Sequence, residues 1–202
     1  MNTGDDICAL LLAAGEGRRY GRLKQLETLD GISLLQRAAR AALDSALELF
    51  VVSGAGADDV HAELSGWPVQ LVHNPHWQRG MGSSIACGVR AVMQQRPMAS
   101  ALMILLADQA LIHAGEVQAM LAMHRAQPTR LIAADHGKAF GPPCVFPSDC
   151  FDALAQLDGE AGAKRVLEQH RERLMRIAMP AAAFDVDTPD DLARLIERSR
   201  QP

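Results

Sequence analysis

Residues 10–25 read LLLAAGEGRRYGRLKQ, and this stretch decides the fold of the 202-residue chain. An apolar run over residues 7–13 is typical of a buried strand. It leads into a segment with three glycines and four cations, and no helical period begins before Ser33. Glycines let backbone N–H groups approach an anion, and arginine and lysine add donors and charge. The stretch therefore predicts a strand followed by a loop that binds a triphosphate.

Two better-known glycine motifs do not fit this loop. A P-loop requires Gly-x4-Gly-Lys-Ser/Thr, whereas Lys24 lies between Leu23 and Gln25. A Rossmann dinucleotide fingerprint requires Gly-x-Gly-x-x-Gly that opens directly into a helix, and the third glycine here comes one residue too late. On motif spacing alone, a flexible loop with solvated charges stays an alternative.

The motif AAGxGxRxGxxKQ at residues 13–25 resembles the signature loop of nucleotidylyltransferases with a glycosyltransferase-A-like fold. Within that group the chain is most similar to the molybdenum cofactor cytidylyltransferases, close to the guanylyltransferases and the methylerythritol-phosphate cytidylyltransferases. Tyr20 stands where these families usually carry methionine, a packing difference that we expect to leave the chemistry intact. The resemblance implies nucleotide binding by Ala13, Ala14, Gly15, Gly17 and Arg18, and catalytic cations at Arg19 and Lys24.

Composition limits the classes to which the chain can belong. With 202 residues, 49% of them hydrophobic, and no Pro/Gly/Ser-rich or charged linker, we expect one domain over residues 1–202. The formal charge of −4 argues against a nucleic-acid partner. Without a basic leader or an apolar run of about 18 residues, we expect a cytoplasmic protein with no membrane segment. Four scattered cysteines, with no Cys-x-x-Cys pair, indicate free thiols rather than zinc ligands or disulfides.

Strand-length apolar runs alternate with helical patterns, which predicts a mostly parallel sheet covered by helices on both faces. The resemblance implies a single-domain, Rossmann-like three-layer α/β/α fold of the nucleotide-diphospho-sugar transferase type, with an antiparallel strand and a small β-extension. Pro142-Pro143 predicts a loop or a sheet edge, because proline donates no ladder hydrogen bond. Expected strands span residues 7–13, 47–53, 69–73, 101–107, 131–134 and 174–178; helices are expected after the capping-box residue Ser33, at 57–64, 85–94 and 113–124, from 162, and after Thr188.

Residues 74–85 are rich in proline, glycine and serine, and they precede the helix expected at 85–94. Free N–H groups and hydroxyls at such a helix start can bind an anion or the polar edge of a base. The alternative is that one serine only caps the helix. The family resemblance implies nucleotide contacts by Gly80 and Ser84, and by Ser83 as a weaker candidate.

Carboxylates at two distant positions point to a magnesium site. Asp108 follows the apolar run 101–107, and ligands of open α/β sheets gather where strands end, although an aspartate there can also cap the next helix. Asp185 and Asp187 have i, i+2 spacing on an expected short strand and would point the same way. The resemblance implies Asp108 and Asp187 as the Mg²⁺ ligands, with Asp185 second; Ala110 stands where the family has proline.

Two further segments resemble the acceptor side of the family's cleft. The first implies acceptor contacts by Gly141 and Pro143, after a hairpin turn expected at residues 135–139. The second implies contacts by Gly162 and Lys164, where a helix start could accept a phosphate. A plain surface turn explains the second segment nearly as well.

The reaction implied is transfer of a nucleotidyl group to the phosphate of an acceptor, with loss of pyrophosphate and no protein base. The Ala13-Ala14 pair matches the cytidylyl enzymes, so we expect CTP as donor and Mo-molybdopterin as acceptor. A guanylyltransferase, a cytidylyltransferase for a sugar phosphate or methylerythritol phosphate, and delivery of finished cofactor to a molybdenum hydroxylase stay open.

Overall fold

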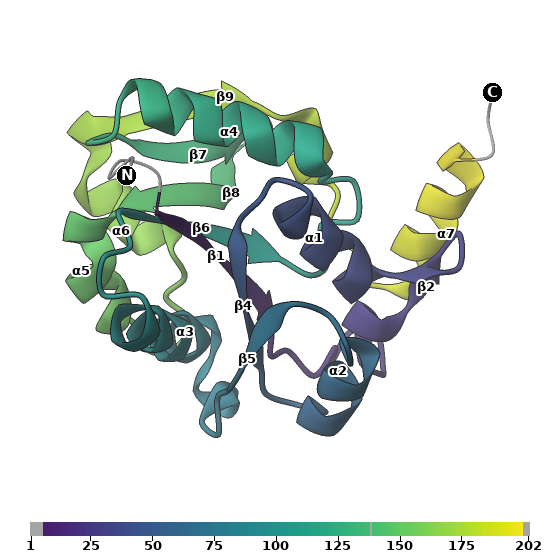
Figure 1. The fold of residues 1–202 in the computed structure, drawn as a ribbon. Helices are drawn as coiled ribbons and strands as arrows, with labels where there is room; N and C mark the ends of the chain where they lie inside the picture. The colour runs from purple at the N-terminus through teal and green to yellow at the C-terminus, as the bar shows by residue number, and fades with distance from the viewer. Residues whose placement is uncertain (1–5, 138, 200–202) are drawn as a thin grey trace.

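The computed structural model describes residues 6–137 and 139–199, and Figure 1 shows them as strands between layers of helices. The seven-stranded sheet has the order β5-β4-β1-β6-β8-β7-β9, and every strand runs parallel to β1 except β8. The predicted fold class is confirmed, including the antiparallel strand. The sheet comprises β1 (Ile7–Ala13), β4 (Glu48–Ser53), β5 (Val69–His73), β6 (Ala101–Leu106), β7 (Leu131–Asp135), β8 (Phe140–Pro147) and β9 (Leu174–Ala178).

Helices cover both faces of this sheet, and a two-stranded extension lies beside it (Figure 1). Within the described residues, no helix has the length and apolar character needed to cross a membrane. The α-helices are α1 (Leu34–Leu43), α2 (Ala57–Glu63), α3 (Met81–Gln95), α4 (Ala114–Ala126), α5 (Phe151–Ala155), α6 (Lys164–Gln169) and α7 (Pro189–Ser199); the extension pairs β2 (Thr28–Leu29) with β3 (Ile32–Ser33).

β1 lies in the middle of the sheet and is buried on both faces. Leu11 and Ala13 pack in a core with α1 and α4, whereas Cys8 and Leu10 pack in a second core with α3, α5 and α6. Burial on both sides explains why this strand reads as an unbroken apolar run. The glycine loop therefore leaves the sheet from a strand that is held on both faces.

The prediction of a loop or sheet edge at Pro142-Pro143 is wrong. β8 lies between β6 and β7, inside the sheet. Its pairing with β7 passes from Cys144 opposite Ala133 to Gly141 opposite Ala134, so the two prolines stand in a bulge. The pairing with β6 reaches only as far as Cys144, so the missing N–H groups interrupt no ladder.

The starts of three helices differ in detail from those predicted. Ser33 caps α1 as predicted, accepting a 3.1 Å hydrogen bond from the Gln36 backbone, but the Gln36 side chain donates to α2 instead of completing the box. α3 begins at Met81, four residues before the predicted start, so both serines lie inside its first turns. α6 begins at Lys164, two residues after the predicted start.

The C-terminal helix α7 packs on the β2–β3 extension. Tyr20 and Leu29 contact Val186 and Leu192 in a third small core, which is the packing role expected of Tyr20. Thr188 and Asp191 form the predicted cap: the Thr188 N–H donates to the Asp191 carboxylate at 2.8 Å, and the Asp191 N–H donates to the Thr188 hydroxyl at 3.3 Å.

The segment before α7 is not the short strand that the spacing of Asp185 and Asp187 suggested. Residues 184–188 are irregular in the described structure. The Val186 N–H donates to the Asp108 carbonyl at 3.0 Å, and this bond brings Asp187 beside Asp108. The predicted turn after β7 is present, with the His136 N–H donating to the Ala139 carbonyl at 3.1 Å. Lys138 of that turn lies outside the described residues, as do the first five residues, on which the expectation about a leader rests.

Candidate active site

One buried amide ties the start of the glycine loop to the sheet. Gln25 Nε2 donates to the Ala13 carbonyl at 3.2 Å and to the Gly15 carbonyl at 3.1 Å. Gln25 is 3% exposed; its bond to Ala13 is buried and its bond to Gly15 is partly buried. The loop motif includes Gln25 but does not reveal its role, because that role depends on the path of the folded loop.

Gly17 allows the loop to fold back on itself. Its φ angle is +69°, and a Cβ at this position would lie 2.0 Å from the Arg22 carbonyl oxygen. The Gly17 carbonyl also accepts hydrogen bonds from the N–H groups of Tyr20 at 2.9 Å and Gly21 at 2.8 Å. Glycine is required here both for conformation and for space, whereas Gly15 has no neighbouring heavy atom within 4 Å of its hypothetical Cβ.

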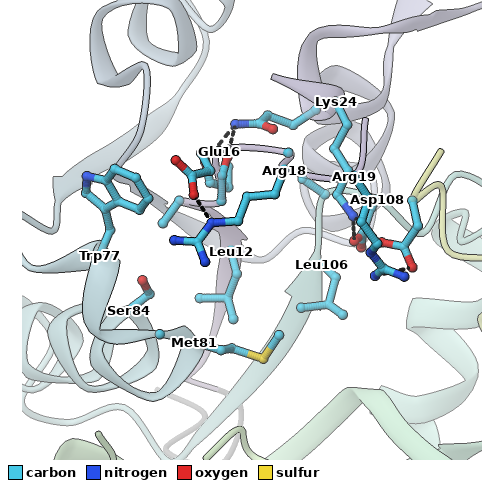
Figure 2. Close-up of a pocket in the computed structure, with 18 of the residues that line it drawn as sticks. Leu12, Glu16, Arg18, Arg19, Lys24, Trp77, Met81, Ser84, Leu106 and Asp108 are labelled. Carbon is cyan, nitrogen blue, oxygen red and sulfur yellow. Dashed lines mark hydrogen bonds and ion pairs between the residues drawn. The ribbon is translucent and has the colours of Figure 1, made fainter. Parts of the chain in front are cut away.

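Three segments that are distant in sequence meet at Lys24. The Lys24 ammonium contacts Asp108 Oδ2 at 2.6 Å and Asp187 Oδ1 at 2.8 Å. The other oxygen of Asp187 forms an ion pair with the Arg19 guanidinium, at 2.8 Å. Figure 2 shows Lys24, Arg19 and Asp108 gathered on one side of the pocket. The structure thus brings together both predicted catalytic cations and both predicted metal ligands.

Lys24 and Asp108 are largely shielded from water, with side chains that are 18% and 19% exposed. Burial alone would lower the pKa of Lys24, but the charges and hydrogen bonds of Asp108 and Asp187 outweigh it, and the pKa stands above its ordinary value. The second oxygen of Asp108, Oδ1, is buried without a hydrogen-bond partner. An unpaired carboxylate oxygen beside a second carboxylate is a donor set that suits a hard divalent cation.

Asp185 lies near enough to this cluster to interact electrostatically with Asp108, Asp187 and Lys24. Burial, followed by the negative charge of Asp108, raises the pKa of Asp185 to about 6. Asp185 does not line the cavity. Within residues 6–137 and 139–199, no group of three His, Cys, Asp or Glu side chains is arranged to hold a metal by itself. Any metal at this site would need ligand or water oxygens besides Asp108 and Asp187.

A cavity of about 400 Å³ lies over the carboxyl ends of β1 and β6, where ligands of open α/β sheets bind. Its size lies within the usual range for small-molecule sites. Three cationic and four carboxylate side chains line it, so its formal charge is −1. The lining includes Ala13, Ala14, Gly15, Glu16, Gly17, Arg18, Arg19, Lys24, Trp77, Gly80, Met81, Ser84, Asp108, Glu160 and Asp187.

The two sides of the cavity differ in chemistry. Figure 2 shows Trp77, Ser84 and Met81 on the side opposite Lys24 and Asp108. Trp77 sits close to the backbone after β4, since a Cβ on Gly54 would lie 2.5 Å from the Cβ of Trp77. One side therefore offers an aromatic ring and a hydroxyl beside the Glu16–Arg18 pair, and the other offers Lys24, Arg19 and Asp108 (Figure 2).

Asn74 organises the two serines that follow it. Its side-chain amide donates to the hydroxyls of Ser83 and Ser84, each at 3.0 Å. The Ser83 hydroxyl also donates toward the carbonyls of His76 and Gly80, at 3.0 and 2.8 Å, and Ser83 does not line the cavity. Ser84 does line it, so only one of the two predicted serines is placed to face a ligand.

Glu16 and Glu160 are carboxylates that sequence reasoning did not select. Both line the cavity, and Glu16 pairs with Arg18 within the loop. Glu16 lies inside the cationic loop, where a carboxylate resembles ordinary surface charge, and Glu160 lies in the segment before Gly162, which was assigned to the acceptor. The fourth loop cation, Arg22, pairs with Glu27 at 2.5 Å and does not line the cavity.

The four predicted acceptor residues do not line this cavity. Gly141 and Pro143 belong to β8, while Gly162 and Lys164 follow Glu160 along the chain. The Lys164 ammonium lies 5.5 Å from the Phe140 ring centroid, and the Arg176 guanidinium lies 4.4 Å from the same centroid. Two cations thus flank an aromatic ring where β8 begins.

The cysteines are free thiols, as predicted. Cys8, Cys144 and Cys150 are buried, and Cys87 is partly exposed. None of the four lines the cavity.

The match to a family model gives the class of this chain, which is that of the NTP transferases. The chain belongs to the MobA-like NTP transferase domain family, whose model matches residues 9–174. The matched span contains the glycine loop and Asp108 and ends before Asp187. The resemblance drawn from the loop motif is thereby confirmed at the level of the family.

Three curated relatives cover nearly the whole chain. Nicotine blue oxidoreductase from Paenarthrobacter nicotinovorans is 31% identical over 94% of this chain and 96% of its own. Purine catabolism protein PucB from Bacillus subtilis is 28% identical over 92% and 93%. A probable molybdenum cofactor guanylyltransferase from Nostoc sp. is 25% identical over 94% and 90%.

Solved structures share the fold. Rv0371c from Mycobacterium tuberculosis superimposes with a TM-score of 0.81 at 24% identity, over 96% of this chain and 99% of that chain. A manganese complex of Rv0371c gives 0.76 at 23%, over 95% and 98%. A nucleotidyl transferase from Methanothermobacter thermautotroptrophicus gives 0.79 at 21%, over 95% and 96%.

Proposed function

We propose that the protein transfers CMP from CTP to the phosphate of Mo-molybdopterin, with Mg²⁺, giving molybdopterin cytosine dinucleotide and pyrophosphate. The observation that carries the proposal is the convergence of Lys24 on Asp108 and Asp187, at 2.6 and 2.8 Å, beside a glycine loop. Lys24, Asp108 and Asp187 line the same cavity as the glycine loop, and this supports the proposal. We place the reaction in the cytoplasm, where nucleoside triphosphates are supplied.

The reaction forms a bond between an acceptor phosphate oxygen and the α-phosphorus of CTP, and it breaks the bond to the β-phosphate bridging oxygen. The loop N–H groups and Arg18 would hold the phosphates, while Arg19 and Lys24 would stabilise charge on the leaving pyrophosphate. An ionised acceptor phosphate needs no protein base. Asp108 and Asp187 would hold Mg²⁺, which supplies neutralisation of phosphate charge when bound.

The donor base would occupy the side of the cavity opposite Lys24. Trp77 offers a face for stacking, and Ser84 offers a hydroxyl for the polar edge of the base. Gly80 lines the cavity and would contact the nucleotide; glycine is needed there because its φ angle is +110° and a Cβ would lie 2.5 Å from the Gly159 carbonyl oxygen. The choice of CTP rests on the Ala13-Ala14 pair of the loop motif.

The acceptor would approach from the side of Glu160. Gly141 and Pro143 lie on β8, and Lys164 lies beside the Phe140 ring at the start of that strand. Lys164, with Gly162 before it, would meet the acceptor near its phosphate, because a cation there complements the charge of the attacking group.

The test is pyrophosphate release from each of CTP, GTP, ATP and UTP, with Mg²⁺ and Mo-molybdopterin. We expect CTP to react fastest and Asp108→Asn to lose at least about 100-fold in rate, as when other electrostatic stabilisers are removed. Asp152→Asn is the matched control, because this carboxylate is exposed on α5 outside the cavity. Faster release from GTP would replace the cytidylyl assignment with a guanylyl one. Release only with a sugar phosphate or methylerythritol phosphate would replace the acceptor.

Two further activities can be assayed with the same purified protein. The oxidoreductase name of the 31%-identical relative motivates a pyridine-nucleotide oxidation assay, although the loop lacks the spacing of a dinucleotide fingerprint.

A delivery role toward a molybdenum hydroxylase is tested by supplying preformed cofactor with Asp108→Ala. Support of the hydroxylase by that variant would show delivery that does not depend on catalysis.

A further inference from the structure

Lys24 contacts the carboxylate oxygens that a metal would need. The Lys24 ammonium bridges Asp108 Oδ2 at 2.6 Å and Asp187 Oδ1 at 2.8 Å. Both contacts are charge-assisted hydrogen bonds. Arg19 pairs with the remaining oxygen of Asp187 at 2.8 Å. The two carboxylates are therefore matched by two protein cations.

The burial of this cluster makes the competition between cations strong. Lys24 and Asp108 are less than a fifth exposed, so their attraction is screened less than that of a surface ion pair. A divalent ion entering alone would have to displace the ammonium and leave it buried without a partner. Of the four carboxylate oxygens of Asp108 and Asp187, only Asp108 Oδ1 could bind a metal without displacing a protein cation, because it is buried and unpaired.

A triphosphate changes this balance. The cavity lining carries a formal charge of −1, so a bound triphosphate leaves a strong excess of negative charge. Lys24 is a mobile point charge on a flexible stem, and phosphate oxygens offer it new partners. When Lys24 moves to the phosphates, the two aspartates lose their counter-ion and become free for a metal.

We propose that Lys24 is the internal counter-ion of Asp108 and Asp187, and that Lys24 and a divalent cation exclude each other from these two carboxylates until a triphosphate draws Lys24 away. The proposal rests on the proposed nucleotidyl transfer. Metal affinity is then low in the protein alone and rises with bound nucleotide. By linkage, the metal raises the affinity for nucleotide by the same factor.

The experiment measures Mn²⁺ binding without nucleotide, by calorimetry and by electron paramagnetic resonance of free Mn²⁺. We expect Lys24→Met to bind Mn²⁺ at least about tenfold more tightly than the wild type. Lys24→Arg keeps the charge and should bind as weakly as the wild type. Arg22→Met is the matched control, because this cation of the same loop pairs with Glu27 and contacts neither aspartate. Lys24→Gln, measured alongside, keeps the test valid if Lys24→Met fails to fold.

Three outcomes are decisive. Equal Mn²⁺ affinity of wild type and both neutral variants would overturn the proposal, as would an equal gain in Arg22→Met. A gain that disappears in Lys24→Met/Asp108→Asn would support it, because the metal then depends on the freed carboxylate. Pyrophosphate release by the wild type is scored separately: its absence, together with a gain in Lys24→Met, would count against the proposed function alone.

Discussion

Replacing Gly17 by alanine tests whether the close approach of the loop backbone sets the geometry of the site. The φ angle of +69° costs a non-glycine residue about 1–2 kcal/mol. In addition, the new Cβ would lie 2.0 Å from the Arg22 carbonyl oxygen, so the loop must shift by on the order of 1 Å. The same Cβ would lie 3.2 Å from the backbone nitrogen of Lys24. The shift therefore reaches the residue whose side chain contacts both aspartates.

Two other glycines of the loop separate these effects. Gly21 has a φ angle of +85° and open space around it, so Gly21→Ala carries only the conformational cost. At about 1–2 kcal/mol, this lowers the melting temperature of a chain of this length by about 2–8 °C. Gly15→Ala carries neither the conformational cost nor the steric one, and it should have the same melting temperature as the wild type.

The assay combines thermal unfolding followed by circular dichroism with pyrophosphate release. We expect Gly17→Ala to melt below Gly21→Ala, and its transfer rate to fall by about 100-fold, the effect of misplacing a catalytic group by about 1 Å. If Gly17→Ala melts together with Gly21→Ala and keeps its rate within about threefold, the contact with Arg22 does not fix the loop and the reasoning fails.

Three further perturbations follow from the site and the core. Trp77→Ala should weaken CTP binding by about 1–3 kcal/mol through loss of stacking, measured by calorimetry; unchanged affinity would place the base elsewhere. Gln25→Leu should lower the free energy of unfolding in urea by about 1–3 kcal/mol, because two loop carbonyls lose their buried donor. Burial raises the pKa of Cys8 to about 11 and that of Cys150 to about 12, so both thiols stay protonated at pH 8. Iodoacetamide should therefore label the partly exposed Cys87 first by mass spectrometry, and prior labelling of Cys8 would contradict its burial.

The six parallel strands of the sheet and most helices were predictable because their signals are local. Residues 7–13 are apolar on both faces of a central strand, and Thr188 with Asp191 forms a cap within one helical turn. The errors arose where partners come from elsewhere. Pro142-Pro143 lies inside the sheet because a bulge removes both prolines from the ladder, and this depends on the register with β7. The start of α3 at Met81 was missed because glycine and serine at residues 80–84 read as an irregular backbone.

The candidate site divides in the same way. The loop motif indicated Arg19, Lys24 and the glycines, since their spacing is contiguous. Asn74 and Gln25 were not selected, because each acts by hydrogen bonds that exist only once the chain is folded. The predicted acceptor residues rest on family resemblance, and they stay a prediction.

The sequence by itself determined the alternation of strands and helices, the cationic glycine loop, the helix caps and the family, because each of these is encoded in neighbouring residues. Only the tertiary structure decided that Lys24 meets Asp108, 84 residues away, and Asp187, 163 residues away. The reason is physical: β1 and β6 pair directly, so the segments after them emerge side by side, and a backbone hydrogen bond from Val186 to Asp108 brings the last aspartate to the same place. Charges from three separate segments thereby share one cavity.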